Sequence, residues 1–336
     1  AVAVAMIAGA LLIRQQLNDD DNGDGGSSSG TGNGDGGPAL LVCATELAAA
    51  CEAVELEGFE TRVEPAGVTA DALIAGEGEL DAWLTVSPWP AMVDGARERA
   101  GEAPVFDTTD LPPLARSPLV VVGVAERMEA LVSRCDDGEV YWSCLGAVAG
   151  LQWGDIGGEP GWGDVRPGHD RLDTSATGLA VLGSAVADFF GTTEISSAEF
   201  EQDAFRSWFT RLERAVPRFE GDTGSLLQDL LVIPGSFDAV GATEAEASAM
   251  LDLAGARGER LVILYPSAMA TADAVLALRA GRDGERLVDA VENAGVAALD
   301  DARWHVGNNG DLPEGSGLPS AGVLVRLRQL WSEAAG

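Results

Sequence analysis

The spacing of Asp173, Ser175 and Thr177 matches the D-x-S-x-T loop that holds a divalent cation in metal-ion-dependent adhesion sites. Such a loop must be held at the end of a buried apolar strand that directly precedes the aspartate. Residues 166–172 instead read RPGHDRL, a charged stretch with Pro and Gly that is typical of a loop. We therefore expect no metal site at this motif.

The two histidines, His169 and His305, are the available bases for a Ser-His-Asp hydrolase. A nucleophilic serine on a G-x-S-x-G turn directly after a strand would support that reading. No such turn follows a predicted strand in this chain. We therefore predict that the chain is not an enzyme and has no catalytic residues or cofactor.

The four cysteines lie in two close pairs, Cys43 with Cys51 and Cys135 with Cys144. There is no C-x-x-C motif, and two histidines are poor material for completing a zinc site. The pairing indicates two local disulfides formed in an oxidising compartment. The alternative is four buried free thiols in a cytosolic protein.

Short hydroxyl side chains stand in the loops and strand-to-helix junctions that the sequence predicts. Such residues can cap a helix, or they can donate hydrogen bonds to a bound solute. Neutral amides and hydroxyls at helix N-termini can hold an anion without any lysine. Ordinary helix capping is the competing interpretation for each one. The residues are Thr45, Thr69, Ser87, Ser117, Ser175, Thr177 and Thr243.

Three larger side chains are further candidates for contact with a solute. Arg116 could clamp a carboxylate or an oxyanion with two hydrogen bonds, or it could form a surface ion pair. Trp89 could wall a binding cleft, or it could pack in the core. Tyr265 could line a hinge between lobes.

Apolar runs alternate with helical patterns from residue 39 onwards, which predicts an α/β fold with mostly parallel sheets flanked by helices. No internal repeat is visible. We predict strands at residues 39–43, 59–65, 81–86, 119–124, 237–241, 261–265 and 274–278. We predict helices at residues 46–57, 91–100, 177–190, 197–216, 285–293 and 321–333, and a short helix that follows Gly67 and Thr69 and ends at Ile74.

The charge of the chain is strongly acidic. The 336 residues carry 54 acidic and 21 basic side chains, for a net charge of −33, and every basic residue other than histidine is arginine. A field of this sign repels phosphate backbones, so the composition argues against nucleic acid as a partner. Salt would screen the self-repulsion of such a surface, which suggests a halophilic source; a merely acidic secreted protein is the alternative.

The first 38 residues differ from the rest of the chain. Residues 1–13 are unbroken apolar residues or glycine, which predicts that residues 1–17 are a transmembrane anchor, or else an uncleaved signal segment. Residues 18–38 are rich in Gly, Ser and Asp, which predicts a disordered linker. The chain is then expected at the extracellular face of the cell membrane.

The order of several motifs resembles the type II periplasmic solute-binding protein family, nearest the molybdate-type branch. The resemblance covers residues 38–336. Its motifs are residues 43–45 before a helix, 66–69 with 80–83, 115–122, 173–179, and 237–241 followed by 261–266.

The resemblance implies two lobes, residues 39–122 plus 267–336 and residues 123–266, that close by a hinge on a small solute, with an oxyanion among the candidates. Thr45, Thr69 and Ser87 are then expected to face Ser175, Thr177 and Thr243 across one cleft, with Arg116 near the hinge. The implied partner is a membrane permease of the ABC type. An anchored sensor or interaction protein of the same fold is the alternative, which neighbouring genes for a permease and an ATPase would distinguish.

Overall fold

A computed structural model describes residues 39–335, apart from 136–137, 218–220, 234 and 308–311. The predicted anchor and linker at residues 1–38 therefore lie outside the described residues. Within the described part of the chain, none of the helices is long and apolar enough to cross a bilayer.

The strands form a mixed sheet in the order β2-β1-β3-β8-β4-β6-β5, and β7 and β9 also pair with β4. Their bounds are β1 Leu40–Ala44, β2 Glu60–Glu64, β3 Ala82–Val86, β4 Ala115–Val124, β5 Pro167–Gly168, β6 Ala239–Thr243, β7 Leu261–Leu264, β8 Thr271–Leu278 and β9 His305–Val306.

The prediction of mostly parallel sheets is wrong. Parallel pairing joins β1 to β2, β1 to β3 and β5 to β6, whereas β8 runs antiparallel to both β3 and β4. The strands β6, β7 and β9 are antiparallel to β4 as well. An apolar run indicates that a strand is buried on both faces, but it says nothing about the direction of the neighbouring strand.

Strand β4 links two groups of strands. Its residues 115–118 pair with β8, with Arg116 opposite Asp273, and its residues 119–124 pair with β6 and β7. The strand therefore starts at Ala115, four residues before the predicted start. Residues 115–118 were not predicted as strand because Arg116 and Pro118 interrupt the apolar pattern. A charged residue and a proline are both unusual inside a strand.

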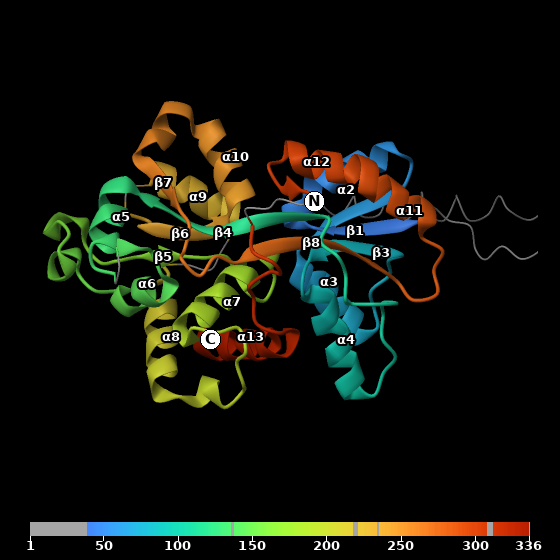
Figure 1. Ribbon diagram of the computed structural model, residues 1–336, viewed down its shortest axis with the longest axis horizontal. Helices are drawn as coiled ribbons and strands as arrows, with labels where there is room; N and C mark the ends of the chain where they lie inside the picture. Colours follow the sequence, from blue (N-terminus) through green and yellow to red (C-terminus); the bar gives the residue numbers. More distant parts are fainter. Residues whose placement is uncertain (1–38, 136–137, 218–220, 234, 308–311, 336) are drawn as a thin grey trace, which may run out of the picture. The chain divides into compact units, whose positions relative to one another are not determined.

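Helices cover both sides of each group of strands (Figure 1). Around β1, β3 and β8 lie α2 (Ala48–Leu56), α3 (Ala66–Ala75), α4 (Trp89–Ala100), α11 (Glu285–Ala290) and α12 (Val296–Asp301). Around β4 and β6 lie α5 (Ala125–Val132), α6 (Trp142–Val148), α7 (Ala176–Phe190), α8 (Asp203–Ala215), α9 (Thr223–Val232), α10 (Glu244–Ala254) and α13 (Ala321–Ala335). Helices α5, α6, α9 and α10 were not predicted from the sequence.

Helix α7 is the central helix of its group. All residues from Ala176 to Ala187 are buried, as expected for a helix that is apolar around its whole circumference. It contacts β4, β6, β8 and α13, so several elements hold its N-terminus in place. Gly191 ends the helix with a φ of 68°, a left-handed conformation that favours glycine.

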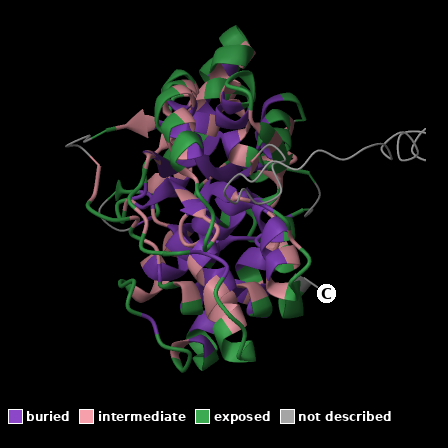
Figure 2. Cartoon of the chain, turned by 90° about the vertical axis from the view of Figure 1, so that its right-hand side faces the viewer, coloured by how far each residue is buried: buried purple, intermediate pink, exposed green. Residues whose placement is uncertain are grey.

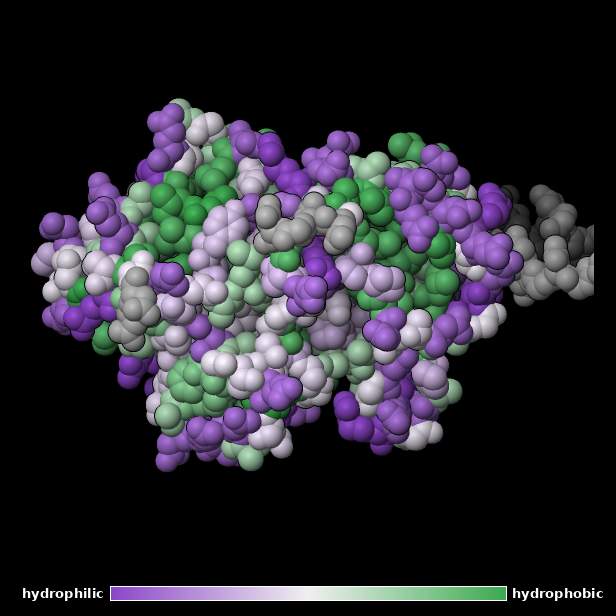
Figure 3. Space-filling model, viewed as in Figure 1, coloured by the Kyte–Doolittle hydropathy of each residue, from purple (hydrophilic) through white to green (hydrophobic). Residues whose placement is uncertain are grey.

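Buried residues fill the inside of both groups, and exposed residues lie at the periphery (Figure 2). On the face drawn in Figure 3, hydrophobic residues gather near β7 and α9 and again near α2 and β1. Both predicted disulfides are present: Cys43–Cys51 ties β1 to α2, and Cys135–Cys144 ties the segment after α5 to α6.

Candidate solute-binding site

A cavity with a volume of about 1090 Å³ lies beside the turn after β1 and is called the acidic cavity here. Residues from several separate parts of the chain converge on it, including the turn after β1, the loop before α7, the start of α9 and helix α10. It is lined by Thr45, Glu46, Pro65, Asp170, Thr174, Ser175, residues 221–225, Gln228, Leu231, Val232, Glu246, Ala249, Met250, Leu253, Ala254 and Arg257.

Three helices begin at this cavity, and a side chain caps each of them. Ser175 Oγ accepts a hydrogen bond from the Gly178 amide at the start of α7 (3.0 Å). Asp222 accepts one from the Ser225 amide at the start of α9 (2.8 Å). Thr243 and Glu246 form a reciprocal capping box on α10. Side chains of this chain therefore cap the N-termini of all three helices.

Glu46 occupies the N-terminus of α7. It belongs to η1 (Thr45–Leu47), the single turn that follows β1. Its Oε1 accepts hydrogen bonds from the Ser175 hydroxyl (3.0 Å), the Ala176 amide (2.8 Å) and the Thr177 amide (3.1 Å). The partial positive charge of a helix N-terminus favours a carboxylate at this place. The chain's own carboxylate thus fills the site where an anionic solute would dock.

Two buried acids lie beside Glu46. Burial, with the Glu46 charge acting in the same direction, raises the pKa of Glu246 to about 7 despite the hydrogen bonds from Thr243 and Thr177, which lower it. Burial likewise raises the pKa of Asp170 to about 6, with the charges of Glu46 and Asp222 acting in the same direction. Near neutral pH these carboxyl groups are therefore poised between their neutral and charged forms.

The other wall of the cavity is apolar. Leu231 and Val232 come from the end of α9, and Met250 and Leu253 come from α10. Val232 is 47% exposed and Leu253 is 90% exposed, so apolar surface is available for contact with a solute. The cavity thus combines an acidic end with an apolar wall, as small-molecule sites often do.

The predicted hydroxyl residues are only partly brought together. Thr45 and Ser175 line the acidic cavity. Thr177 and Thr243 do not line the cavity, but both donate hydrogen bonds to Glu246, which does (3.0 and 2.7 Å). Ser117 lies within β4, not in a loop as predicted, and its Oγ accepts a hydrogen bond from the Ala245 amide (3.0 Å).

Thr69 and Ser87 do not line the cavity. Thr69 lies inside α3, not ahead of a helix as predicted, and its hydroxyl donates to Glu64 (2.7 Å). Ser87 follows β3, and its amide donates to the Asp273 carbonyl (2.8 Å). Thr177 was predicted as the first residue of a helix and is the second residue of α7, because the helix begins at Ala176.

The three larger candidates also lie outside the lining of the acidic cavity. Trp89 is 1% exposed and packs beneath the Arg328 guanidinium, with 4.9 Å between that group and the ring centre. Arg116 forms an ion pair with Asp273 (3.7 Å) and donates to the Pro313 carbonyl (3.0 Å). Tyr265 follows β7 and donates to Glu244, which also binds His305 (2.6 Å).

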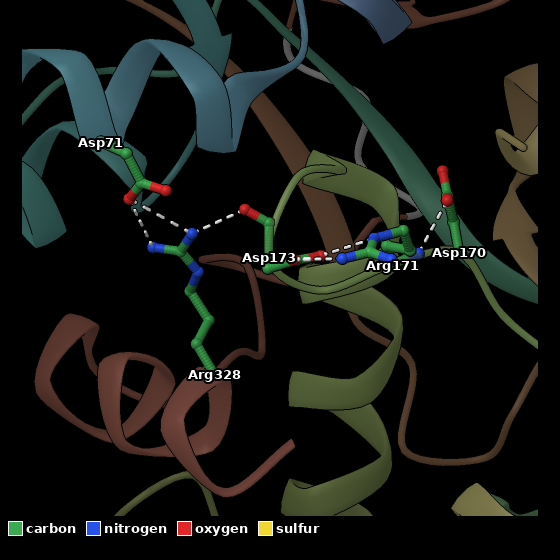
Figure 4. A network of polar contacts seen from close by, with 5 residues as sticks. All are labelled: Asp71, Asp170, Arg171, Asp173 and Arg328. Carbon is green, nitrogen blue, oxygen red and sulfur yellow. Dashed lines mark hydrogen bonds and ion pairs between the residues drawn. The ribbon is translucent and has the colours of Figure 1, made fainter. Parts of the chain in front are cut away.

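Backbone contacts and one arginine join α3 to the loop before α7. The Gly67 amide donates to the Thr174 carbonyl (2.8 Å). Arg328, from α13, reaches Asp71 of α3 (3.4 Å) and the Asp173 carbonyl (2.6 Å), as Figure 4 shows. These contacts position one rim of the acidic cavity.

The D-x-S-x-T loop is likewise held by local contacts. The Asp173 carboxylate binds the Arg171 guanidinium (3.0 and 2.5 Å), and the Arg171 amide donates to Asp170 (Figure 4). Ser175 is the cap of α7. The Asp173 carboxylate is therefore paired with the guanidinium of Arg171.

The four cavity acids, Glu46, Asp170, Asp222 and Glu246, were not among the residues predicted from the sequence. One signal was available, since Thr243 and Glu246 have the T-x-x-E spacing of a capping box. Nothing in the local sequence shows that Glu46 caps a helix 130 residues further along the chain. That contact depends on the tertiary structure.

Comparisons with known proteins support the fold. No family model and no curated protein sequence matches this chain. The structure of the periplasmic binding protein P5PA is similar over 90% of this chain and 100% of its own, with a TM-score of 0.55 and 11% identity. A putative spermidine/putrescine ABC transporter from Listeria monocytogenes is similar over 88% of this chain and 98% of its own, with a TM-score of 0.54 and 11% identity. Apo ferric ion-binding protein A from Pasteurella haemolytica is similar over 89% of this chain and 96% of its own, with a TM-score of 0.51 and 12% identity. The chain thus has an α/β fold of the periplasmic-binding-protein type.

Proposed function

We propose that this chain captures a small solute in the acidic cavity and delivers it to an ABC-type membrane permease. The observation that carries the proposal is the cavity itself, about 1090 Å³ in volume and lined by residues from both sides of the linking strand β4. A cavity of this size suits a small organic molecule. The fold it shares with solved substrate-binding proteins supports the same role.

The proposed action is binding without turnover. Two lobes, residues 39–122 plus 267–336 and residues 123–266, close on the solute by a hinge. Each histidine is paired with a glutamate, His169 with Glu213 (3.2 Å) and His305 with Glu244 (2.6 Å), and neither histidine lines the acidic cavity. The described residues at the cavity therefore offer no nucleophile with a histidine base.

The proposed location is the outer face of the cell membrane. Two disulfides suit an oxidising compartment. Residues 1–17 would anchor the chain in the membrane, and residues 18–38 would tether the folded part to that anchor. An oxyanion fits this cavity poorly, because Glu46 already occupies the α7 N-terminus and further acids lie beside it.

A thermal-shift screen of amines, amino acids, sugars and oxyanions tests the proposal. A ligand at a hundred times its Kd stabilises by about 2.7 kcal/mol, which raises the Tm of a folded chain of about 300 residues by about 4–5 °C. Gln228→Trp would fill the cavity from the exposed face of α9. Gln329→Trp makes the same change at an exposed position on α13 that does not line the cavity.

We expect a hit that stabilises the unmodified chain and Gln329→Trp but not Gln228→Trp. A hit that stabilises all three proteins equally would place binding elsewhere. A screen in which no solute raises the Tm would contradict a solute-binding function.

A further inference from the structure

The charges around the acidic cavity favour a cation. Four carboxylates line it, Glu46, Asp170, Asp222 and Glu246, against the single exposed cation of Arg257. The three helix N-termini that could attract an anion are already capped by side chains of this chain. An incoming anion would have to displace Glu46 and remain among like charges, which is unfavourable.

One carboxylate oxygen at the cavity lacks a partner. Glu46 Oε1 accepts three hydrogen bonds, whereas Glu46 Oε2 is buried and has no hydrogen-bond partner among the described residues. Thr177 links this carboxylate to Glu246, because its amide donates to Glu46 and its hydroxyl donates to Glu246. A buried, unpaired carboxylate oxygen beside a second buried acid is destabilising unless a cation or a proton compensates it.

The geometry indicates an organic cation and argues against a bare metal ion. Within the described parts of the chain, no three His, Cys, Asp or Glu side chains are grouped closely enough to hold a metal ion. The wall opposite the acids is apolar, with Leu231, Val232, Met250 and Leu253. A hydrated metal ion would gain nothing from that wall, whereas an alkyl or aryl group would bury apolar surface on it.

We infer that the solute is an organic ammonium or amidinium ion with an apolar body, whose charged head contacts Glu46 and Glu246 while its body lies against α9 and α10. The inference rests on the proposed function, because it assigns a ligand class to the same cavity. The raised pKa values of Glu246 and Asp170 support it independently of the apolar wall. A bound cation would lower both pKa values, so binding would release protons near neutral pH.

Three probes of one size separate charge from apolar contact: n-hexylammonium, n-hexanol and n-hexanoate at constant ionic strength. Binding to the full chain is measured by ligand-observed NMR at millimolar concentration and by calorimetry in two buffers of different ionisation enthalpy. We expect hexylammonium to bind at least about tenfold more tightly than hexanol, as a charge-assisted hydrogen bond allows, and hexanoate not to bind. Hexylammonium should bind more tightly at about pH 8 than at about pH 5.5, with proton release between them.

Substitutions at the acidic cavity test whether hexylammonium binds there. Glu246→Gln removes a charge and keeps an acceptor for Thr177 and Thr243, so hexylammonium should bind about tenfold more weakly while hexanol is unaffected. Asp222 is an exposed helix cap at which asparagine is tolerated, so Asp222→Asn should weaken the binding of hexylammonium by about threefold. This variant replaces Glu246→Gln if the latter folds poorly. Asp252→Asn is the matched control, because Asp252 is exposed on α10 and does not line the cavity.

The outcomes separate the ligand class from the function. Equal affinity for hexylammonium and hexanol, or no effect of Glu246→Gln and Asp222→Asn, would overturn the cation assignment. If the solute screen yields only anions or sugars whose binding Gln228→Trp abolishes, the ligand class is wrong and the solute-binding function stands. If hexylammonium fails to bind at all and the screen also finds nothing, both proposals fail.

Discussion

The Gly67 amide donates a hydrogen bond to the Thr174 carbonyl at 2.8 Å, so the start of α3 rests directly on the backbone of the loop before α7. No side chain fits between them: a Cβ at Gly67 would lie 1.8 Å from the Asp173 carbonyl oxygen. Glu46 contacts the same region from the turn after β1. These contacts join residues more than a hundred positions apart into one rim of the acidic cavity.

Gly67→Ala should therefore destabilise the protein by about 1–3 kcal/mol, because the added methyl group overlaps backbone atoms that cannot rotate away. Urea denaturation monitored by tryptophan fluorescence measures this loss. Gly322→Ala is the matched control, since Gly322 is also the second residue of a helix and a Cβ there would meet open space. Equal stability of the two variants would contradict the close contact at Gly67.

Replacing Ser175 and Thr177 together by alanine should cost about 2–3 kcal/mol of folding free energy. Ser175 caps α7 and donates to Glu46, and Thr177 donates to Glu246, so the double change removes a cap and two hydrogen bonds. Such a loss differs from the effect of a residue that contacts only the solute, which would leave the denaturation midpoint unchanged. Differential scanning calorimetry of both proteins distinguishes the two results.

Glu246 should make the stability of the unliganded protein fall as the pH rises. Its folded-state pKa is raised from 4.5 to about 7, so the folded protein holds a proton that the unfolded chain releases. Stability relative to Glu246→Gln is then full below about pH 4.5 and is lost by about pH 7, a difference on the order of 3 kcal/mol. Denaturation of both proteins across this range tests the sign, and a difference that does not change with pH would contradict it.

The buried pair of His169 and Glu213 should stabilise the folded protein more at acidic pH than at basic pH. Burial lowers the His169 pKa, but the charge and hydrogen bond of Glu213 outweigh it, so the pKa is raised above 6.5. The stabilisation is therefore present below pH 6.5 and is lost as the pH rises through the folded-state pKa. Glu213→Gln should cost about 3 kcal/mol at about pH 6 and less at about pH 9. A cost that grows with pH would refute this assignment.

Each disulfide should contribute about 2–3 kcal/mol, because each closes a loop of about ten residues and restricts the unfolded chain. Mass spectrometry of unreduced peptides should recover Cys43 joined to Cys51 and Cys135 joined to Cys144. Serine replacement of either pair should then lower the urea midpoint. Free thiols or a crossed pairing in the peptide map would show that the assignment is wrong.

Local patterns in the sequence were sufficient to predict the order of most strands and helices. The apolar run at residues 39–43 indicates a buried strand wherever it pairs, and the spacing of Cys43 and Cys51 indicates a local disulfide. Helix α9 was not predicted, because its polar start and its short apolar stretch give a weak periodic signal. The start of β4 at Ala115 was not predicted, because Arg116 and Pro118 interrupt its apolar pattern.

The tertiary structure alone decided strand direction and the composition of the candidate site. An apolar strand such as β8 reads the same whether its neighbours are parallel or antiparallel, so the sequence did not reveal its antiparallel pairing with β3 and β4. The helix N-termini that the hydroxyl residues suggested as anion sites are real, but Glu46 reaches one of them from 131 residues away. Because a charge acts through space and not along the chain, only the fold could show that four acids of this chain line one end of the cavity.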